Sequence, residues 1–587
     1  MVPLSEQTRL LTFDSEVANG ATRGGQMRFK MYGRTTMRGR GIGVLLAGVA
    51  MVAESTLVTL PAGALGINGY YANNFSDSGA SVSQATCELK TNTTCTLRDA
   101  ITFANQDGSL DFDTIFLSPK AGTYVLDGPN HPLVVTSNSY LSIDGSGPAT
   151  SIIDGGNTSQ VFSLSAGALS ISGVTITRGY TTQKGGAIFN SKALTLSNVN
   201  VTGNSALLEG GAIFSSGTLS IEGGGLSNNS SINGCGGAVA SSGTLTVTRA
   251  SFVSNESECG GAIQQDPGGP IMVESSLIKS NYVRDYGDGG GFLLNGTATL
   301  TNDTIVNNTT TEYGGGLSAV NNANVSLTQS TIANNNAFFG GGGVYLSSTN
   351  GHLNLVGNIL NGNTQYMGQP SQCLAYYGTF TSTYNVVGSN VDLGCHFVGS
   401  GDQNGKSAGL GALAVHGGPT PTEAIPTSSP AFQSVPIGAC LPTDARGVAR
   451  TQTGPHGYCD AGAYEVAAAT GPVSCTTISG TAPNAVTLSG CTPKSTTSKS
   501  ASISSNLIGN AAGAITWHPS SKTSYVVGGW TAKGQGVCAA TYTEEDFSGA
   551  VMSGSSTYTH FFDRASIRLC LAANNTVKIA PGSKVAL

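Results

Sequence analysis

A Gly-Gly step followed by a small or apolar residue recurs seven times between residues 185 and 344. The copies read GGAIFN, GGAIFS, GGAVAS, GGAIQQ, GGGFLL, GGGLSA and GGGVYL. With the two glycines directly before the apolar residue as the marker, the repeats begin at Gly185, Gly210, Gly236, Gly260, Gly290, Gly315 and Gly342. Self-similarity at steps of 24 to 30 residues predicts a solenoid.

A second motif, an apolar residue followed by two residues and then Asn, occurs shortly before the next Gly-Gly, at 201–204, 226–229, 252–255, 278–281, 305–308 and 332–335. Short alternating runs such as 193–196 and 298–301 predict strands with one buried face. A coil of about 25 residues cannot bury its own apolar face, so successive coils must stack as parallel strands about 4.8 Å apart. We therefore expect an all-β protein built on a right-handed parallel β-helix.

The two motifs suggest roles inside such a coil. Gly-Gly marks a turn that needs a positive φ or close backbone packing, and the recurrent Asn tolerates the left-handed region. Stacked Asn side chains are expected to form a ladder between coils. Only 10% of the residues are charged and the net charge is −6, which argues against binding to nucleic acid.

Residues 1–66 are interpreted as an N-terminal extension and signal peptide, with the signal starting at about Met37. Arg38-Gly39-Arg40 precedes an apolar run from 42 to 53, and Ala62-Gly63-Ala64 resembles a cleavage site. An N-terminal membrane anchor is the alternative, although this run is shorter than the ~20 residues that a spanning helix needs. We expect a secreted or cell-surface protein without a stable membrane span after the signal is removed.

Twelve cysteines fall into local couples, which in a secreted chain predicts disulfides. The couples are 87/95, 235/259, 373/395, 440/459, 475/491 and 538/570. Cys235 and Cys259 both directly precede Gly-Gly, so stacked coils would place their Cα atoms about 5 Å apart, within disulfide range. A metal site would need further Cys or His nearby, and none follows from the pattern.

The chain divides into segments by pattern. Residues 67–110 form the predicted N-terminal cap, whose helix starts at Thr96 with a capping-box-like Asp99 and has Leu97, Ala100, Ile101 and Ala104 on one face. Residues 111–365 form the β-helix, of roughly ten coils. Residues 366–466 form a C-terminal cap, and after a linker at 467–472 residues 473–587 are expected to form a small β-sandwich-like domain.

Two segments resemble known families. The stretch CTLRDAI at 95–101, with Ala104-Asn105, resembles the CSLREA domain. Residues 410–465, with HGGPTPT, SSPAF, TDARGVAR and CDAGAYE, are similar to the choice-of-anchor Q domain of bacterial surface proteins. The Gly-Gly-Ala and Asn motifs also resemble repeats of polymorphic outer membrane proteins. These resemblances imply a secreted or surface-displayed β-helix protein, whereas the domain at 473–587 departs from family members that end in a sorting signal or anchor.

The acidic residues of the repeat have two interpretations: a ligand stripe or catalytic pair along one edge of the coils, or solvated turns that keep this edge soluble. Glu209, Glu258, Asp285, Asp288 and Glu312 precede the Gly-Gly turns, and Glu256, Asp266 and Glu274 lie nearby in sequence. Basic residues are scattered over different positions of the repeat, at Arg178, Lys184, Lys192, Arg249, Lys279 and Arg284. Asp144 and Asp154 are interpreted as turn residues. This pattern identifies no catalytic, cofactor or metal residue, and no cofactor is expected.

Aromatic residues gather in the later coils, partly beside these acidic turns. They are Tyr282, Tyr286, Phe292, Tyr313, Phe338, Phe339 and Tyr345, of which Phe292 and Tyr345 are the first expected in the core. Rings beside carboxylates can hold sugars. The sequence favours a monomeric, non-catalytic adhesin or envelope scaffold that contacts a glycan or cell-surface protein along its lateral face. The alternative is a carbohydrate-active enzyme, a polysaccharide lyase or glycoside hydrolase, that acts on the acidic, aromatic edge.

Overall fold

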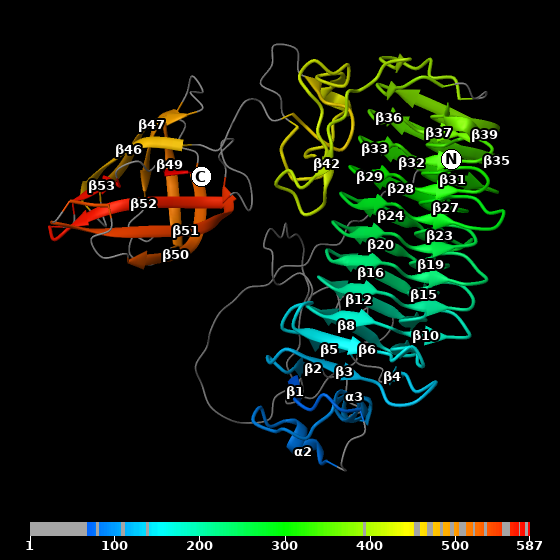
Figure 1. Ribbon diagram of the computed structural model, residues 1–587, viewed down its shortest axis with the longest axis horizontal. Coiled ribbons are helices and arrows are strands. Elements are labelled where there is room, and N and C mark those ends of the chain that lie inside the picture. Colours follow the sequence, from blue (N-terminus) through cyan, green and yellow to red (C-terminus); the bar gives the residue numbers. More distant parts are fainter. Residues whose placement is uncertain are drawn as a thin grey trace, which may run out of the picture.

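The structure is a computed structural model that describes residues 67–77, 82–106, 112–136, 140–390, 395–450 and 458–466, together with most strands between 474 and 586 (Figure 1). The predicted extension and signal peptide at 1–66 and the predicted linker at 467–472 lie outside the described residues. Within the described residues, no helix is both long and apolar enough to cross a membrane.

Three sheets run along the repeat region, which Figure 1 shows as a stack of coils, and their strands are parallel except for an antiparallel pair at the end of the third sheet. The first sheet has 20 strands among the described residues, mostly two from each coil: β1 (Ile67–Ala72), β2 (Phe112–Leu117), β4 (Leu133–Val135), β5 (Tyr140–Asp144), β7 (Phe162–Leu164), β8 (Ala168–Ser172), β11 (Ile188–Asn190), β12 (Ala193–Ser197), β15 (Ile213–Ser215), β16 (Thr218–Glu222), β19 (Val239–Ser241), β20 (Leu245–Thr248), β23 (Ile263–Gln265), β24 (Ile271–Glu274), β27 (Phe292–Leu294), β28 (Thr297–Thr301), β31 (Leu317–Val320), β32 (Asn324–Thr328), β35 (Val344–Val356) and β39 (Cys373–Thr383).

The second and third sheets contribute shorter strands. In the described chain the second has 12: β3 (Gly122–Val125), β6 (Ser151–Asp154), β9 (Thr175–Thr177), β13 (Asn200–Thr202), β17 (Gly225–Ser227), β21 (Ser251–Val253), β25 (Leu277–Lys279), β29 (Thr304–Val306), β33 (Thr331–Ala333), β36 (Ile359–Asn361), β40 (Val386–Val387) and β41 (Gln403–Asn404). The third has nine: β10 (Tyr180–Thr181), β14 (Ser205–Ala206), β18 (Ser230–Ser231), β22 (Glu256–Ser257), β26 (Tyr282–Val283), β30 (Thr309–Thr310), β34 (Asn336–Ala337), β37 (Thr364–Gln365) and β38 (Gln369–Pro370).

Equivalent residues of successive repeats pair directly. Ile188 pairs with Ile213, which pairs with Val239, and that residue pairs with Ile263. All four are fully buried, and they belong to one apolar core that extends through the coils. The prediction of a parallel β-helix is confirmed.

The predicted Asn ladder is present in the turns that connect the strands of the second sheet to those of the third sheet. The Nδ2 of Asn229 donates to Oδ1 of Asn255 at 2.9 Å, and Asn255 donates in the same way to Asn281 at 2.9 Å. The ladder runs through Asn204, Asn229, Asn255, Asn281, Asn308, Asn335 and Asn363 and ends on Oε1 of Gln372. Each amide is buried, so these bonds stabilise the stacking of one coil on the next.

One detail of the Asn prediction is wrong. The ladder residues are not in the left-handed region; the residue before each of them is, as at Asn228, Ser254 and Asn307 with φ of 53°, 56° and 57°. The left-handed residue turns the chain, and the following Asn is thereby free to direct its amide along the stack.

The Gly-Gly turn needs both of the properties predicted for it. Gly210 has a φ of 68°, and a Cβ on Gly211 would lie 2.2 Å from the carbonyl oxygen of Gly237 in the next coil. In the three GGG repeats, however, the left-handed residue is the first glycine, as at Gly289 with a φ of 75°. The third glycine occupies the position of the alanine in the GGA repeats. In these three coils the sequence marker, which was set at Gly290, Gly315 and Gly342, therefore lies one residue after the left-handed glycine.

Five predicted disulfides are confirmed: 87–95, 235–259, 373–395, 440–459 and 538–570. The Cα atoms of Cys235 and Cys259 lie 4.6 Å apart in equivalent positions of adjacent coils, as the repeat predicted. Cys475 is opposite Cys491 in an antiparallel strand pair, but the side chain of Cys491 lies outside the described residues.

Two helices lie at the N-terminal end of the stack, α2 (Gln84–Cys87) and α3 (Leu97–Gln106) (Figure 1). The predicted capping box is confirmed, because Thr96 Oγ1 accepts from the amide of Asp99 at 3.1 Å and Asp99 Oδ2 accepts from the amide of Thr96 at 3.1 Å. The four residues predicted on its apolar face are buried, so α3 is the expected capping helix. Parallel pairing already begins at β1, which pairs with β2.

The segment from about 408 to 466 lies beside the later coils, where Figure 1 shows β42 next to β29 and β33. Its short elements are β42 (Leu413–Ala414), β43 (Thr422–Glu423), β44 (Val435–Pro436), η2 (Ile437–Ala439) and β45 (Tyr458–Cys459). Leu410 and Leu413 pack on Leu277, Val306 and Ala333 of the second sheet. This segment therefore covers the flank of the solenoid.

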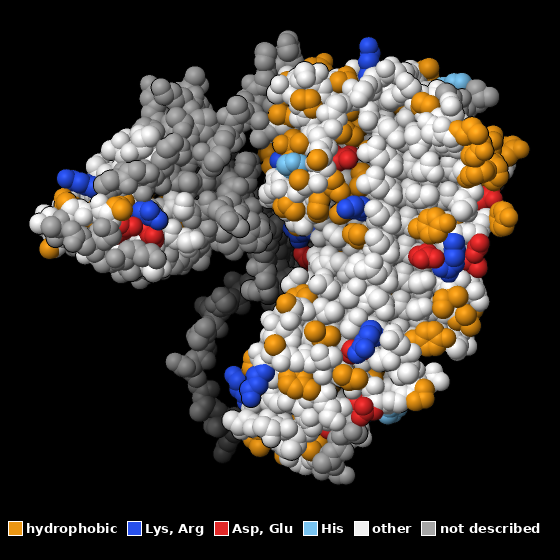
Figure 2. All heavy atoms as spheres, viewed as in Figure 1, with side chains coloured by type: hydrophobic (Ala, Val, Ile, Leu, Met, Phe, Trp, Pro, Cys, Tyr) orange, Lys and Arg blue, Asp and Glu red, His pale blue; other side chains and the backbone are white. Residues whose placement is uncertain are grey.

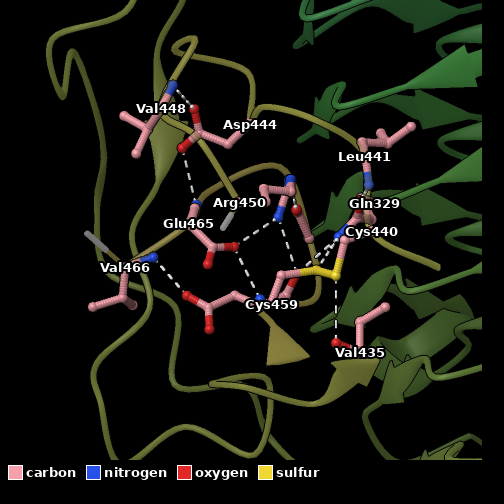
Figure 3. A network of polar contacts seen from close by, with 12 residues as sticks. Gln329, Val435, Cys440, Leu441, Asp444, Val448, Arg450, Cys459, Glu465 and Val466 are labelled. Atoms are coloured by element: carbon pink, nitrogen blue, oxygen red, sulfur yellow. Dashed lines mark hydrogen bonds and ion pairs between the residues drawn. A yellow bond between two sulfur atoms is a disulfide. The ribbon is translucent and has the colours of Figure 1, made fainter. Parts of the chain in front are cut away.

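A buried polar network centred on Arg450 holds this segment in place (Figure 3). Arg450 is fully buried, with Nη1 3.1 Å from Oε2 of Glu465 and Nη2 donating to Oδ1 of Asn302 on the solenoid at 2.8 Å. Gln329 Nε2 donates to the carbonyl oxygen of Asp460 at 3.1 Å. The pKa of Asp460 is raised to about 7, mainly by burial and secondly by the negative charge of Glu465. Because these charges satisfy one another away from solvent, the network has a structural role.

The C-terminal residues form an antiparallel sheet of nine described strands: β46 (Ser474–Thr481), β47 (Ala485–Thr492), β48 (Ser498–Ile503), β49 (Ala512–Pro519), β50 (Thr523–Ala532), β51 (Tyr542–Gly554), β52 (Arg564–Ala572), β53 (Val577–Ile579) and β54 (Val585–Ala586). Strand β51 also pairs with β52, so the sheet closes on itself. The described strands belong to one sheet, and the expectation of a β-sandwich is therefore not supported.

Replacing a central ladder residue should destabilise the solenoid. In Asn281→Ala, the amide and side-chain N–H groups of Asn255 lose their acceptor, and so we expect the free energy of unfolding to fall by about 3 kcal/mol. Chemical denaturation followed by circular dichroism measures this loss. The matched control is Asn350→Ala, since Asn350 is exposed at the coil surface. Equal losses in both variants would contradict the role of the ladder.

The flanking segment should become less stable as the pH rises. Burial raises the pKa of Glu423 to about 7 from an ordinary value of 4.5, so the protonated carboxyl favours the folded state. That stabilisation is complete below about pH 4.5 and is lost as the pH rises through about 7. We expect Glu423→Gln to raise the midpoint of thermal unfolding at pH 8.5 but not at pH 4.5. The same change at both pH values would show that the carboxyl does not titrate in this way.

Candidate functional site

Two adjacent columns of side chains run along the outside of the first sheet and together form what we call the lateral strip. The turn column consists of the residues directly before the left-handed glycines: Lys184, Glu209, Cys235, Cys259, Asp288, Tyr313 and Gly340. The strand column consists of residues paired across successive strands: Phe189, Phe214, Ala240, Gln264, Leu293, Ser318, Tyr345 and Leu374.

The strand column points away from the core but is largely covered. Neighbours in each strand alternate between faces, and the residues on either side of this column point into the coil. Phe214, Gln264 and Tyr345 are nevertheless only 8%, 9% and 6% exposed. The turn column explains the burial of two of them, because Lys184 Nζ lies 4.4 Å from the ring centroid of Phe214 and the ring of Tyr313 stacks on Tyr345 at 4.6 Å.

At the later coils the strip carries what we call the aromatic cluster, which comprises Tyr313, Phe338, Phe339, Tyr345, Tyr366 and Tyr376. Phe339 and Tyr376 both approach Tyr313, with centroids 5.6 and 6.0 Å from it, and Phe338 lies 4.8 Å from Tyr366. Phe338, Phe339, Tyr366 and Tyr376 are each 44% to 54% exposed. Figure 2 shows the corresponding patch of apolar side chains at the edge where Figure 1 labels β35, β37 and β39.

A carboxylate lies at the margin of this cluster. Asp288 Oδ1 accepts from the backbone amide of Tyr313 at 3.0 Å, and Oδ2 accepts from the Ser318 hydroxyl at 3.4 Å. Burial raises the pKa of Asp288, and the nearby charge of Glu312 raises it further. The pKa of Tyr313 is raised to about 12. Burial is the main cause, and the interaction with Tyr376 is the second. The tyrosine hydroxyl therefore stays protonated at neutral pH and can donate hydrogen bonds.

The earlier coils of the strip carry a charged group, which we call the carboxylate–lysine cluster: Lys184, Glu209, Gln264 and Asp266. Lys184 Nζ lies 2.6 Å from Glu209 Oε2, and Gln264 Nε2 donates to Asp266 Oδ1 at 2.5 Å. Burial raises the pKa of Asp266, and the charge of Glu209 raises it further, whereas Lys184 and Gln264 oppose the change. The cluster thus combines two carboxyl groups in different surroundings.

The acidic residues singled out from the sequence do not form one row. Glu209 and Asp288 belong to the turn column, where the charge of Glu209 helps to raise the pKa of Asp266 and the charge of Glu312 helps to raise the pKa of Asp288. Glu256 lies on β22, where Arg284 binds it at 2.6 Å. Asp285 lies on an exposed turn, and Asp154 forms a bidentate ion pair with Arg178. No group of three or more His, Cys, Asp or Glu side chains that could hold a metal ion occurs within the described part of the chain.

The aromatic residues were only partly placed correctly from the sequence. Phe292 is fully buried in the core, as expected. Tyr345 is buried as expected, but it lies under Tyr313 on the outside of the sheet and not in the apolar cluster that runs through the coils. Tyr366 and Tyr376 were missed because they follow the last clear repeat. Their signal was the group of four aromatic residues between 366 and 380.

Comparisons with known proteins add little to these observations. No protein-family model and no curated protein matches the sequence. The fold is similar to that in a solved structure described as "Crystal structure of pectate lyase Pel9A", with a TM-score of 0.39 and 14% sequence identity over 68% of this chain and 97% of that chain. At this level of similarity, the likeness says nothing about the activity of this chain.

Proposed function

We propose that this protein is an extracellular carbohydrate-binding protein that holds a neutral polysaccharide on its lateral strip. The observation that carries the proposal is the aromatic cluster, where four rings are about half exposed above the stacked pair Tyr313 and Tyr345. Half-exposed rings on a rigid sheet offer flat apolar surfaces to the C–H faces of sugars, at little cost in side-chain entropy.

Polar groups beside the rings suit sugar hydroxyls. Asp288 offers acceptor oxygens, and the hydroxyls of Tyr313 and Tyr376 can donate or accept hydrogen bonds. Asp288 and Glu312 would repel uronic acids when they are ionised, so we expect neutral sugars to be preferred over pectate-like polymers.

The described disulfides support an extracellular location, because disulfides persist in oxidising environments. The rod of parallel coils presents the lateral strip as a long, rigid surface. Binding there would suit the adhesin or envelope scaffold inferred from the repeat pattern. Hydrolysis or elimination would require reactive groups in addition to the aromatic cluster.

Removing two cluster rings should weaken polysaccharide binding. In Phe339→Ala/Tyr376→Ala, we expect the dissociation constant to rise at least 10-fold, since each ring contributes about 1 kcal/mol to a stacked contact. Affinity electrophoresis in gels that contain mixed-linkage β-glucan, xyloglucan, galactomannan or arabinoxylan measures the change. Tyr286→Ala is the control, because Tyr286 is 90% exposed on another turn.

Two results would overturn this proposal. One is that the wild-type protein is not retarded by any of the neutral polysaccharides. The other is that the double variant is retarded as strongly as the wild type. Stronger retardation by polygalacturonate than by the neutral polymers would contradict the inferred preference for neutral sugars.

A further inference from the structure

The first sheet carries a second group of aromatic rings, at the opposite end of the stack from the aromatic cluster. These rings and the polar residues beside them lie on the strands β1, β2 and β5, and we call them the N-terminal platform: Tyr71, Phe112, Thr114, Phe116, Tyr140, Ser142 and Asp144. Phe116 is 38% exposed, and the other three rings are partly exposed. The four rings belong neither to the apolar core nor to the lateral strip.

The strand register fixes the rings in two pairs. The residues that alternate with the platform along β2 and β5 are buried, so the platform side chains point away from the core. Phe112 pairs with Tyr140 of the next coil, and their ring centroids are 5.6 Å apart. Tyr71 pairs with Phe116, and these rings are stacked at 5.2 Å. Each ring is therefore held in place by a ring of the neighbouring coil before any ligand binds.

Small residues separate the two ring pairs. Gly69, Thr114 and Ser142 form one column that runs between them along the stack. In an extended strand, residues four apart, such as Phe112 and Phe116, lie about 13 Å from each other. The rings therefore project on either side of a row of much shorter side chains, and the distance between them leaves room for a sugar ring.

The column of small residues continues into the next coils as a row of hydroxyls, carried by Ser170, Thr195, Ser220 and Thr246. One hydroxyl occurs in each coil, so neighbours are about 4.8 Å apart. An extended chain of β-1,4-linked sugars advances by a similar distance with each sugar. Each coil can therefore offer one hydroxyl, which both donates and accepts, to each sugar of such a chain.

Asp144 adds an acceptor beside the rings. It was interpreted from the sequence as a turn residue, but it is the last residue of β5 and pairs with Phe116. Its Oδ1 accepts from the hydroxyls of Ser142 at 2.8 Å and Ser172 at 3.1 Å. Its Oδ2 accepts no hydrogen bond within the described part of the chain, so this oxygen is available to a sugar hydroxyl.

This arrangement favours a sugar chain over a protein partner. The centre of a protein interface is a contiguous apolar surface, whereas a glycine or a hydroxyl separates the ring pairs in each coil of the platform. The column from Thr114 to Thr246 has no charged side chain, which favours an uncharged ligand. Asp144 at its margin would repel uronic acids.

We propose that the N-terminal platform is a second site for neutral polysaccharides, on which an extended β-1,4-linked chain lies along the stack between the ring pairs and over the hydroxyl column. Its geometry does not depend on the aromatic cluster. Strands β2 and β35 are nine strand pairings apart, about 43 Å along the stack. A polysaccharide longer than this distance can engage both sites, and binding at one then raises the effective concentration at the other.

Two double variants of the full chain separate the sites. In Phe116→Ala/Tyr140→Ala, we expect the dissociation constant for the neutral polysaccharides to rise at least 10-fold in affinity electrophoresis. Combining this variant with Phe339→Ala/Tyr376→Ala should abolish retardation. Val134→Ala is the matched control and should be retarded like the wild type, because Val134 is 40% exposed but lies on β4, outside the platform. Circular dichroism shows whether each variant folds.

Hydroxyl-radical footprinting tests the site in the wild-type protein, without any substitution. Addition of a neutral polysaccharide that retards the protein should lower the oxidation of Phe116 and Tyr140 by half or more, whereas oxidation of Val134 should not change. Protection that depends on protein concentration and not on the polysaccharide would show that the rings pack against a second copy of the chain, and would overturn the proposal.

The outcomes for the two sites are separable. If Phe116→Ala/Tyr140→Ala is retarded as strongly as the wild type, or if the polysaccharide does not protect these rings, the platform is wrong and the aromatic cluster is unaffected. If retardation depends on the platform but not on Phe339 and Tyr376, the platform stands and the aromatic cluster is wrong. If the wild type is not retarded at all, both are overturned.

Discussion

The hydrogen bonds between identical positions of successive coils are the constraint on which the rest of the structure depends. Each ladder Asn accepts from the amide of the Asn one coil earlier and donates onward to the next, so neighbouring coils are locked into a fixed register. The Gly-Gly turns, which pack beside the ladder, enforce the same register, because any side chain on the second glycine would overlap a carbonyl oxygen of the next coil. Register in turn places every surface residue in a column.

The columns have functional consequences because residues distant in sequence become neighbours only through stacking. Tyr313 and Tyr345 stack because they lie in adjacent coils, one in the turn column and one in the strand column. Lys184 and Glu209 form an ion pair for the same reason. A rigid rod thereby carries an aromatic surface in its later coils and a charged group in its earlier coils, on one face.

The flanking segment adds a constraint that the repeat does not contain. Arg450 contributes a fully buried charge that is neutralised by Glu465 and anchored to Asn302 on the solenoid. Such a network is costly to disrupt, since an unpaired buried charge destabilises a protein by several kcal/mol. The segment therefore covers part of the second sheet. The lateral strip lies on a different surface, that of the first sheet.

The sequence by itself determined the coil, the Asn ladder, the capping helix and the Cys235–Cys259 pair, because each is a local pattern or a position repeated at a known period. It misplaced the turn column in the GGG coils, since only backbone dihedrals show which glycine is left-handed. The tertiary structure alone brought Phe339 and Tyr376 to Tyr313. These contacts join different positions of different coils, so they depend on where side chains point once the coils are stacked, and no sequence period encodes that.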